Sequence, residues 1–203
     1  MKVPTAAAVR AEAYNQYISL TGLRDRILIE INRKNFKDMR WEEIWDTSLR
    51  IRNLFLNNPI PDMLYDSLRH PLKALFSDTA VVVRSSALEE DTAAASFAGL
   101  HESYVNIKGI DSILHHIRLV WASLWSDAAL LYRQELGLDI EKSSMAVVVQ
   151  EIVYGEKSGV AFGKNPNDDT QSVIESVYGL NQGLVDGTVE PDRWILERET
   201  GTI

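Results

Sequence analysis

One arginine stands at the end of a short run of valines, in the segment VVVRSS over residues 81–86. An arginine there offers an always-charged fork of N–H donors, which suits the oxygen atoms of a phosphate group. The same side chain, Arg84, could instead form an ordinary ion pair with Glu89, Glu90 or Asp91. The arginine alone leaves both interpretations open, a phosphate contact and a structural ion pair.

A second candidate is the loop of small residues that follows, SFAG at 96–99, which leads into HES at 101–103. Small side chains and glycine let backbone N–H groups close around an anion. A lone glycine in such a place is more often only a turn. Gly99, Glu102 and Ser103 are therefore candidates for a phosphate-covering loop, with a plain turn as the alternative.

A third candidate lies in MAVVVQEIV at 145–153, an apolar run typical of a strand buried on both faces. Gln150 and Glu151 interrupt the apolar pattern. Where a strand ends beside a cleft, its backbone N–H and C=O groups can read the edge of an adenine, with Ile152 or Val153 as an apolar wall. The alternative is a polar break at the end of a strand.

Other chemistries find little support in the sequence. The four histidines, at 70, 101, 115 and 116, are not spaced like a metal cluster, and we assign no metal ligands. There is no G-x-x-x-x-G-K-[ST], G-x-G-x-x-G or G-x-S-x-G pattern. Trp121 and Trp125 are four residues apart in an apolar stripe, which predicts a core position rather than a ligand platform.

Composition narrows the class of protein further. The chain of 203 residues is 45% hydrophobic and carries a formal net charge of −8, which argues against a broad nucleic-acid or anionic-membrane surface. No apolar run approaches the ~18 residues of a membrane-spanning helix, and no secretion signal is recognisable. With 0 Cys, the composition is compatible with a cytoplasmic protein, which is our expectation.

The hydrophobic periodicity predicts helices first and strands later. We expect helices at 6–23, 24–32 and 39–58, and a fourth at 61–76 that Pro71 interrupts. One long helix is expected over 109–137, with Asp111 as its N-cap and Gly137 as its stop. Strands are expected at 80–86, 104–107, 145–153, 158–166, 170–179 and 191–199. This order predicts an α+β fold of two layers.

Several blocks occur in an order that resembles one family. VRSSALEEDTAAASFAGLHESYVNI, the MAVVVQEIV strand, SGVAF at 158–162 and VIESVYGLNQGLVDGTVEPDRWIL at 173–196 are similar to the nucleotide-binding domain of phosphoenolpyruvate synthase and pyruvate phosphate dikinase. This domain is often called the PEP/pyruvate-binding domain, although it binds ATP. The resemblance covers nearly the whole chain.

The resemblance implies an ATP-grasp-like fold, with a helical N-terminal region packed against a mixed β-sheet lobe. Residues 1–78 would be the mainly helical subregion, and 79–203 the β-rich nucleotide-binding portion that contains the helix at 109–137. Two lobes of such a fold clasp ATP between them.

The resemblance also implies roles for the candidate residues. Arg84 would contact the transferred phosphates. Gly99, Glu102 and Ser103 would belong to the loop that covers the triphosphate. The segment from Gln150 to Val153, which includes Glu151 and Ile152, would hold the adenine. Arg193 is expected to be structural.

The activity implied is an ATP-dependent phosphotransfer. In the family this domain passes phosphate from ATP to a histidine on a separate phosphohistidine domain, which carries it to pyruvate. The family's GGKGxxL loop and the carboxylates that bind Mg²⁺ have no counterpart here, and GLNQ at 179–182 replaces the usual Gly-Leu-Gly-Glu. We therefore expect the magnesium ligands outside this chain, and no phosphotransfer by these 203 residues alone.

Two alternatives stay open at this point. Rifampin phosphotransferases share the domain, so the final acceptor need not be pyruvate. The chain could also be a truncated, non-catalytic ATP-grasp-like module with a regulatory or interaction role. The sequence does not specify an oligomeric state.

Overall fold

The structure of the chain is a computed structural model that describes residues 3–87, 91–92, 95–96 and 101–202. The chain divides into two compact units, Met1–Ile152 (unit 1) and Val153–Ile203 (unit 2). The expected division at 78/79, between a mainly helical subregion and a β-rich portion of one domain, is of another kind and stays a prediction. The two units are described separately.

Unit 1 is built on a four-stranded sheet in the order β1-β6-β2-β5. The strands are β1 (Ala6–Val9), β2 (Val81–Ala87), β5 (Ser103–Ile107) and β6 (Met145–Glu151). A separate pair of two-residue strands consists of β3 (Asp91–Thr92) and β4 (Ala95–Ser96). The α+β class is as predicted, although every pairing among the described strands is antiparallel rather than mixed.

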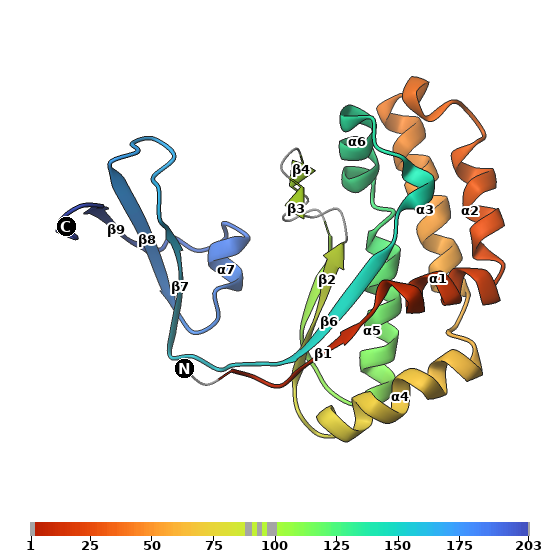
Figure 1. Cartoon of the computed structure of the whole chain (residues 1–203), viewed down its shortest axis with the longest axis horizontal. Coiled ribbons are helices and arrows are strands. Elements are labelled where there is room, and N and C mark those ends of the chain that lie inside the picture. Colours follow the sequence, from red (N-terminus) through yellow and green to blue (C-terminus); the bar gives the residue numbers. More distant parts are fainter. Residues whose placement is uncertain (1–2, 88–90, 93–94, 97–100, 203) are drawn as a thin grey trace. The chain divides into compact units, whose positions relative to one another are not determined.

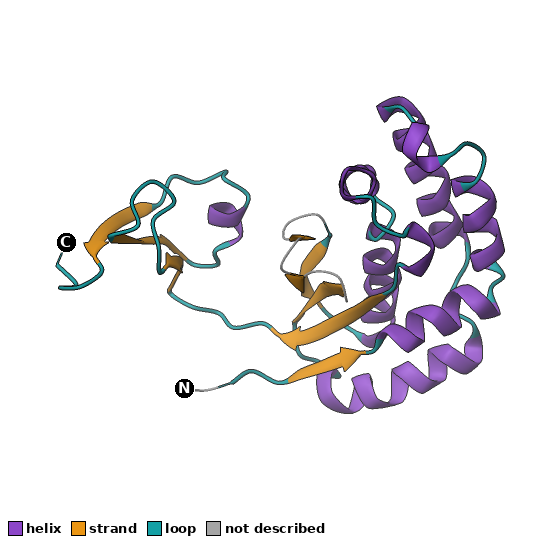
Figure 2. Cartoon of the chain, turned by 45° about the horizontal axis from the view of Figure 1, so that its top comes forward, coloured by secondary structure: helices purple, strands orange, loops and turns teal. Residues whose placement is uncertain are grey.

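Helices cover one face of this sheet (Figures 1 and 2). They are α1 (Ala11–Leu20), α2 (Leu23–Ile31), α3 (Trp41–Asn57), α4 (Asp62–Phe76), α5 (Ile110–Ser123) and α6 (Asp127–Leu136), with single 3₁₀ turns at Phe36–Asp38 and Ile140–Lys142. The core lies between the two layers and includes the fully buried side chains of Tyr14, Tyr17, Ile44, Ile51, Phe55, Phe76, Ile113 and Trp121. No helix among the described residues is long and apolar enough to cross a membrane.

The inner strand β6 shows how the sheet separates its two faces. Met145, Val147 and Val149 are fully buried under the helices, whereas Val148 and Gln150 are only half-buried. The apolar run had predicted burial on both faces, and that prediction was wrong. One face of the sheet packs on the core, and no helix of the described part of unit 1 covers the other, which is called the open face.

The structure differs from the predicted elements at the first strand and at Pro71. Residues Ala6–Val9 were expected to begin a helix but form β1, which pairs along its whole length with β6, from Ala6 opposite Gln150 to Val9 opposite Val147. Helix α4 runs through Pro71 without interruption. Pro71 is on the exposed side, so the carbonyl that loses its N–H partner can meet water, while Leu72 and Phe76 anchor the other side.

The helix expected over 109–137 is two helices, α5 and α6. Ser126 starts the second one, and its side-chain oxygen accepts a hydrogen bond from the N–H of Ala129 at 3.2 Å. The N-cap position of α5 is occupied by Gly109 rather than Asp111. The predicted stop is confirmed, because Gly137 ends α6 in the left-handed conformation (φ 65°) that favours glycine.

Unit 2 is a three-stranded antiparallel sheet in the order β7-β8-β9. Its strands are β7 (Lys157–Phe162), β8 (Gln171–Tyr178) and β9 (Asp192–Glu197), and a single helical turn, α7 (Gln182–Val185), lies between the last two. Arg193 on β9 stands opposite Glu175 on β8, and its Nε donates to the Glu175 carboxylate at 2.6 Å. This cross-strand ion pair agrees with the expected structural role of Arg193.

Candidate functional site

The candidate site lies on the face of the unit 1 sheet that the helices leave open. Val81 and Val83 of β2 are completely buried on the helical side. Side chains alternate along a strand, so Val82 and Arg84 point to the opposite, open face. Arg84 is exposed there.

Strand register brings two more predicted residues to this face. Arg84 stands directly opposite Ser103 on β5, and on its other side opposite Val148 on β6. Gln150 is two residues beyond Val148 on the same strand and stands opposite Val82. Residues directly opposite each other in an antiparallel pair share a face. Arg84, Ser103 and Gln150 therefore project from one open surface.

Arg84 makes no ion pair and no side-chain hydrogen bond with any residue that the structure describes. The possible ion-pair partners Glu89 and Glu90 lie outside the described residues, as does the side chain of Asp91. Within the described part of unit 1, the guanidinium is a free, always-charged donor on a surface with no competing carboxylate bound to it.

Glu102 points to a different part of the molecule from Ser103. Its Oε1 accepts a hydrogen bond from Arg52 Nη2 on α3 at 2.9 Å, and its Oε2 accepts one from the Tyr104 hydroxyl. Burial, and then the hydrogen bond to the carboxylate, raise the pKa of Tyr104 above its usual range. The sequence grouped Glu102 with Ser103, but the side chain of Glu102 bonds to a helix and to Tyr104, whereas that of Ser103 lies on the open face.

The residues of the segment expected to hold adenine also lie on different faces of the sheet. The side chain of Glu151 stands opposite Val81, on the helical side. The backbone N–H of Glu151 already donates to the Thr5 carbonyl at 2.8 Å, and that of Ile152 to the Ala80 carbonyl at 3.0 Å. Of this segment, the Gln150 side chain is therefore the polar group presented on the open face.

The remaining predicted residues fall elsewhere. Ile152 is buried, with 8% of its surface exposed, and Val153 is exposed and begins unit 2. Gly99 lies outside the described residues. Among the residues that the structure does describe, no group of three or more His, Asp or Glu side chains could hold a metal ion.

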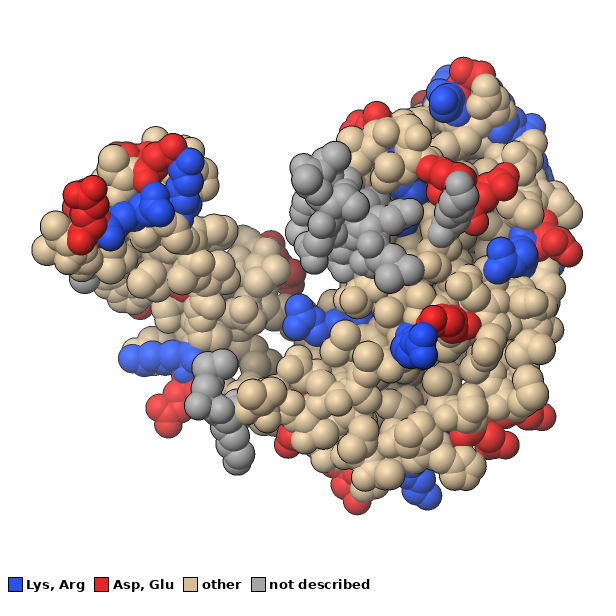
Figure 3. Space-filling model, in the orientation of Figure 1, with Lys and Arg blue, Asp and Glu red and all other residues tan. Residues whose placement is uncertain are grey.

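One side of unit 1 carries charges of both signs. On the side of unit 1 shown in Figure 3, the Lys and Arg side chains of the described residues are interspersed with Asp and Glu among uncharged groups. A ligand with several negative charges would thus be attracted by individual arginines and lysines rather than by a broad basic surface.

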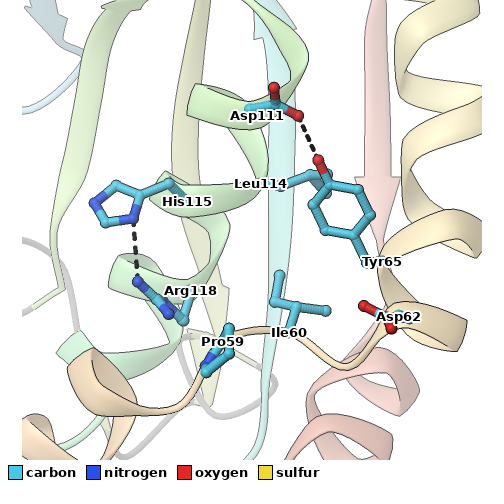
Figure 4. Close-up of a pocket in the computed structure, with 8 residues that line it drawn as sticks. All are labelled: Pro59, Ile60, Asp62, Tyr65, Asp111, Leu114, His115 and Arg118. Carbon is cyan, nitrogen blue, oxygen red and sulfur yellow. Dashed lines mark hydrogen bonds between the residues drawn. The ribbon is translucent and has the colours of Figure 1, made fainter.

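A pocket of about 330 Å³ opens in the helical layer, away from the open sheet face (Figure 4). The Tyr65 hydroxyl of α4 is hydrogen-bonded to Asp111 of α5 on one side, and Arg118 Nη2 donates to His115 Nδ1 at 3.2 Å on the other. Arg118 also donates to the Asn58 carbonyl at 3.1 Å. The polar groups that line the pocket thus largely bind one another. The pocket contains none of the predicted site residues.

Sequence reasoning missed Arg52 and the Ser123 hydroxyl, which accepts a hydrogen bond from the Glu102 N–H at 3.2 Å. Both are far from Glu102 in the sequence and belong to helices without a recognisable motif. Tyr104 lay in a predicted strand, but its contact with Glu102 had no sequence signal. Only the folded arrangement brings these groups together.

Arg84, Ser103 and Gln150 thus share one face of an α+β unit, and Arg84 has no charged partner among the residues that the structure describes. The chain belongs to the family of the pyruvate phosphate dikinase AMP/ATP-binding domain, whose family model matches residues 1–203.

Relatives at full coverage of the chain support this membership. The chain is 35% identical over 207 residues to a probable phosphoenolpyruvate synthase of Staphylothermus marinus, and 37% identical over 203 residues to the phosphoenolpyruvate synthase of Aeropyrum pernix. It is 33% identical over 201 residues to the rifampicin phosphotransferase of Bacillus cereus. These alignments cover 98%, 97% and 98% of the chain but 25%, 25% and 23% of the relatives. The chain therefore spans about a quarter of the length of these relatives.

Proposed function

We propose that the chain is the ATP-binding portion of an ATP-dependent phosphotransferase of the phosphoenolpyruvate synthase and pyruvate phosphate dikinase type. The observation that carries the proposal is the convergence of Arg84, Ser103 and Gln150 on one open sheet face. Family membership and the relatives' names support the same activity.

In this proposal Arg84 binds the phosphate oxygens of ATP, because its guanidinium has no other charged partner among the described residues. The Ser103 hydroxyl and the loop that contains Gly99 cover the triphosphate. The segment from Gln150 to Val153 holds the adenine, with the Gln150 side chain as its polar contact, since the N–H groups of Glu151 and Ile152 already donate to Thr5 and Ala80. The catalytic contribution of such groups is positioning and neutralisation of phosphate charge.

The rest of the reaction depends on groups beyond this chain. Mg²⁺ accompanies the ATP phosphates and is held by carboxylates outside these 203 residues. The phosphate passes to a histidine on another domain of the parent protein, which operates in the cytoplasm. Pyruvate is the proposed final acceptor, and the rifampicin phosphotransferase relative supports an antibiotic as the second candidate. The isolated chain is expected to bind ATP without transferring phosphate.

Calorimetric titration of a non-hydrolysable Mg·ATP analogue into the chain tests the proposal. We expect the wild-type chain to bind and Arg84→Ala to bind at least tenfold more weakly, since hydrogen bonds to charged groups are worth roughly 1.5–3 kcal/mol. Arg84→Lys keeps the charge but not the fork, so its affinity should fall between the two. Equal affinity of wild type and Arg84→Ala would contradict the role of Arg84.

A further inference from the structure

The structure points to Arg52 as a positioning residue of the nucleotide site, acting through Glu102 rather than by touching the nucleotide. We propose that the Arg52–Glu102–Tyr104 cluster fixes the beginning of β5, so that Ser103 stands beside Arg84 on the open face. The inference rests on the proposed function, and it changes the role of Glu102 from a ligand of the triphosphate to an anchor.

Each oxygen of the Glu102 carboxylate accepts a hydrogen bond within this cluster. Oε1 accepts from Arg52 Nη2 at 2.9 Å and Oε2 accepts from the Tyr104 hydroxyl. Each oxygen thus has a partner from a different element, one from α3 and one from β5. A carboxylate held at both oxygens has a fixed orientation and little freedom to turn toward a ligand or a metal ion.

The backbone of Glu102 is tied to a third element, α5. Its N–H donates to Ser123 Oγ at 3.2 Å, and Ser123 Oγ in turn donates to the Val120 carbonyl at 2.8 Å. Ser123 is completely buried, so this attachment point belongs to the core. Residue 102 is therefore connected to two helices and to the strand that it precedes.

Tyr104 completes the anchor from the strand itself. It stands opposite Val83, which is buried on the helical side, and its ring lies edge-on against His116 of α5 with centroids 4.8 Å apart. With Tyr104 fixed on the helical side, the alternation of side chains places Ser103 on the open side. The orientation of Ser103 beside Arg84 thus follows from the contacts of its two neighbours.

The ion pair itself is a weak stabiliser. The side chains of Arg52 and Glu102 are each 39% exposed, and pairs with that exposure contribute little to the free energy of folding. Breaking the pair should leave the fold intact while loosening the orientation of β5. This separation of effects makes the proposal testable.

The first test measures the affinity of the 203-residue chain for a non-hydrolysable Mg·ATP analogue in five variants, one of which is a control. Arg52→Ala should bind about fivefold more weakly than wild type and Glu102→Ala about tenfold, whereas Arg52→Lys should stay within about twofold of wild type. The double variant Arg52→Ala/Glu102→Ala should be no weaker than Glu102→Ala, because both changes remove the same contact. Arg33→Ala breaks a comparable Arg–Glu pair with Glu30 on α2 and should have no effect.

The outcomes separate the inference from the proposed function. If wild type binds and Arg84→Ala does not, but both anchor variants bind like wild type, the inference is overturned while the proposed function stands. A double variant whose loss is the product of the single losses, about fiftyfold, would show independent roles and also overturn it. If wild type fails to bind the analogue at all, the proposed function fails.

A second measurement tests the anchor without nucleotide. In ¹H–¹⁵N NMR spectra, Arg52→Ala should shift the amides of Ser103 and Arg84 and speed hydrogen exchange in β5, and Arg33→Ala should not. Unchanged amide shifts and exchange in Arg52→Ala would overturn the inference whatever the chain binds.

Discussion

Arg84 and Ser103 stand directly opposite each other on β2 and β5, and both side chains leave the sheet on the face opposite to the described helices of unit 1. Between them in the sequence lies the segment of small and acidic residues that includes Gly99. The pairing explains how an arginine at one end of that segment and a serine at the other can bind one ligand. The same pairing shows which neighbouring side chains point away from that ligand.

Gln150 and Glu151 should differ sharply in their effect on nucleotide affinity. Gln150 stands opposite Val82 on the open face, whereas Glu151 stands opposite the buried Val81. We expect Gln150→Ala to weaken binding of a Mg·ATP analogue about five- to tenfold, the value of one lost hydrogen bond, and Glu151→Ala to change it less than twofold. Calorimetry on the two variants checks this. An equal or larger loss in Glu151→Ala would place the adenine elsewhere.

Acid should destabilise the chain partly through His101. Burial and the nearby charge of Arg133 lower the pKa of His101, and a hydrogen bond to the Ser123 carbonyl partly offsets them. The resulting pKa of His101 is about 4. Unfolded histidine has a pKa near 6.5, so between pH 4 and 6.5 the unfolded state binds more protons and stability rises with pH. The contribution is complete above pH 6.5, and about 3 kcal/mol is lost as the pH falls to 4.

Urea denaturation from pH 4.5 to 7.5 measures this contribution as the difference between wild type and His101→Gln. The slope of unfolding free energy against pH should be smaller in His101→Gln below pH 6.5 and equal above it. Parallel profiles over the whole range would show that His101 is protonated as easily in the folded chain as in the unfolded one. The comparison is needed because burial also lowers the pKa of His115.

Tyr14→Phe should destabilise unit 1. The Trp125 indole N–H donates to the Tyr14 hydroxyl at 3.0 Å, and both side chains are buried. Removing the hydroxyl leaves a buried N–H without a partner, which costs about 1–3 kcal/mol. Urea denaturation should show a lower midpoint with an unchanged slope. Tyr178→Phe, at a tyrosine that is 78% exposed, provides the control, and equal stability of the two variants would contradict the prediction.

Gly159→Ala should destabilise unit 2. A Cβ at Gly159 would lie 2.3 Å from the backbone oxygen of Glu175 on the paired strand β8, so the two strands must separate. We expect a loss of about 1–3 kcal/mol, as for other overpacked positions. Hydrogen exchange of the β7 and β8 amides measures it. Gly163→Ala is the matched control, because a Cβ there meets nothing within 4 Å, and equal protection in both variants would be the contrary result.

The elements that the sequence predicted well are those with a strong local pattern. Helix α3 carries buried residues at helical spacing, and the strands β2 and β8 are rich in β-branched residues. Strand β1 was missed because its alanines favour a helix and only the partner strand β6 makes them extended. The break between α5 and α6 depends on the cap at Ser126, which an apolar stripe does not reveal.

Arg84, Ser103 and Gln150 are the candidate residues that the structure brings to one face, and the sequence could not separate them from their neighbours. By residue type alone, Glu102 and Glu151 suit a polar binding site as well as Arg84, Ser103 and Gln150 do. Which face a residue occupies depends on strand register, and register depends on contacts between distant segments. The hydrogen bond from Arg52 to Glu102 is such a contact, and no residue spacing or motif in the sequence predicts it.

The central claim is that the open face of the unit 1 sheet binds the nucleotide, and NMR titration of the ¹⁵N-labelled chain with a non-hydrolysable Mg·ATP analogue tests it most directly. We predict that the amide and side-chain signals of Arg84, Ser103 and Gln150 shift in a saturable way. The signals of residues that line the helical-layer pocket, such as Tyr65 and Arg118, should stay in place. Shifts confined to that pocket, or no saturable shift on β2, β5 and β6, would contradict the account.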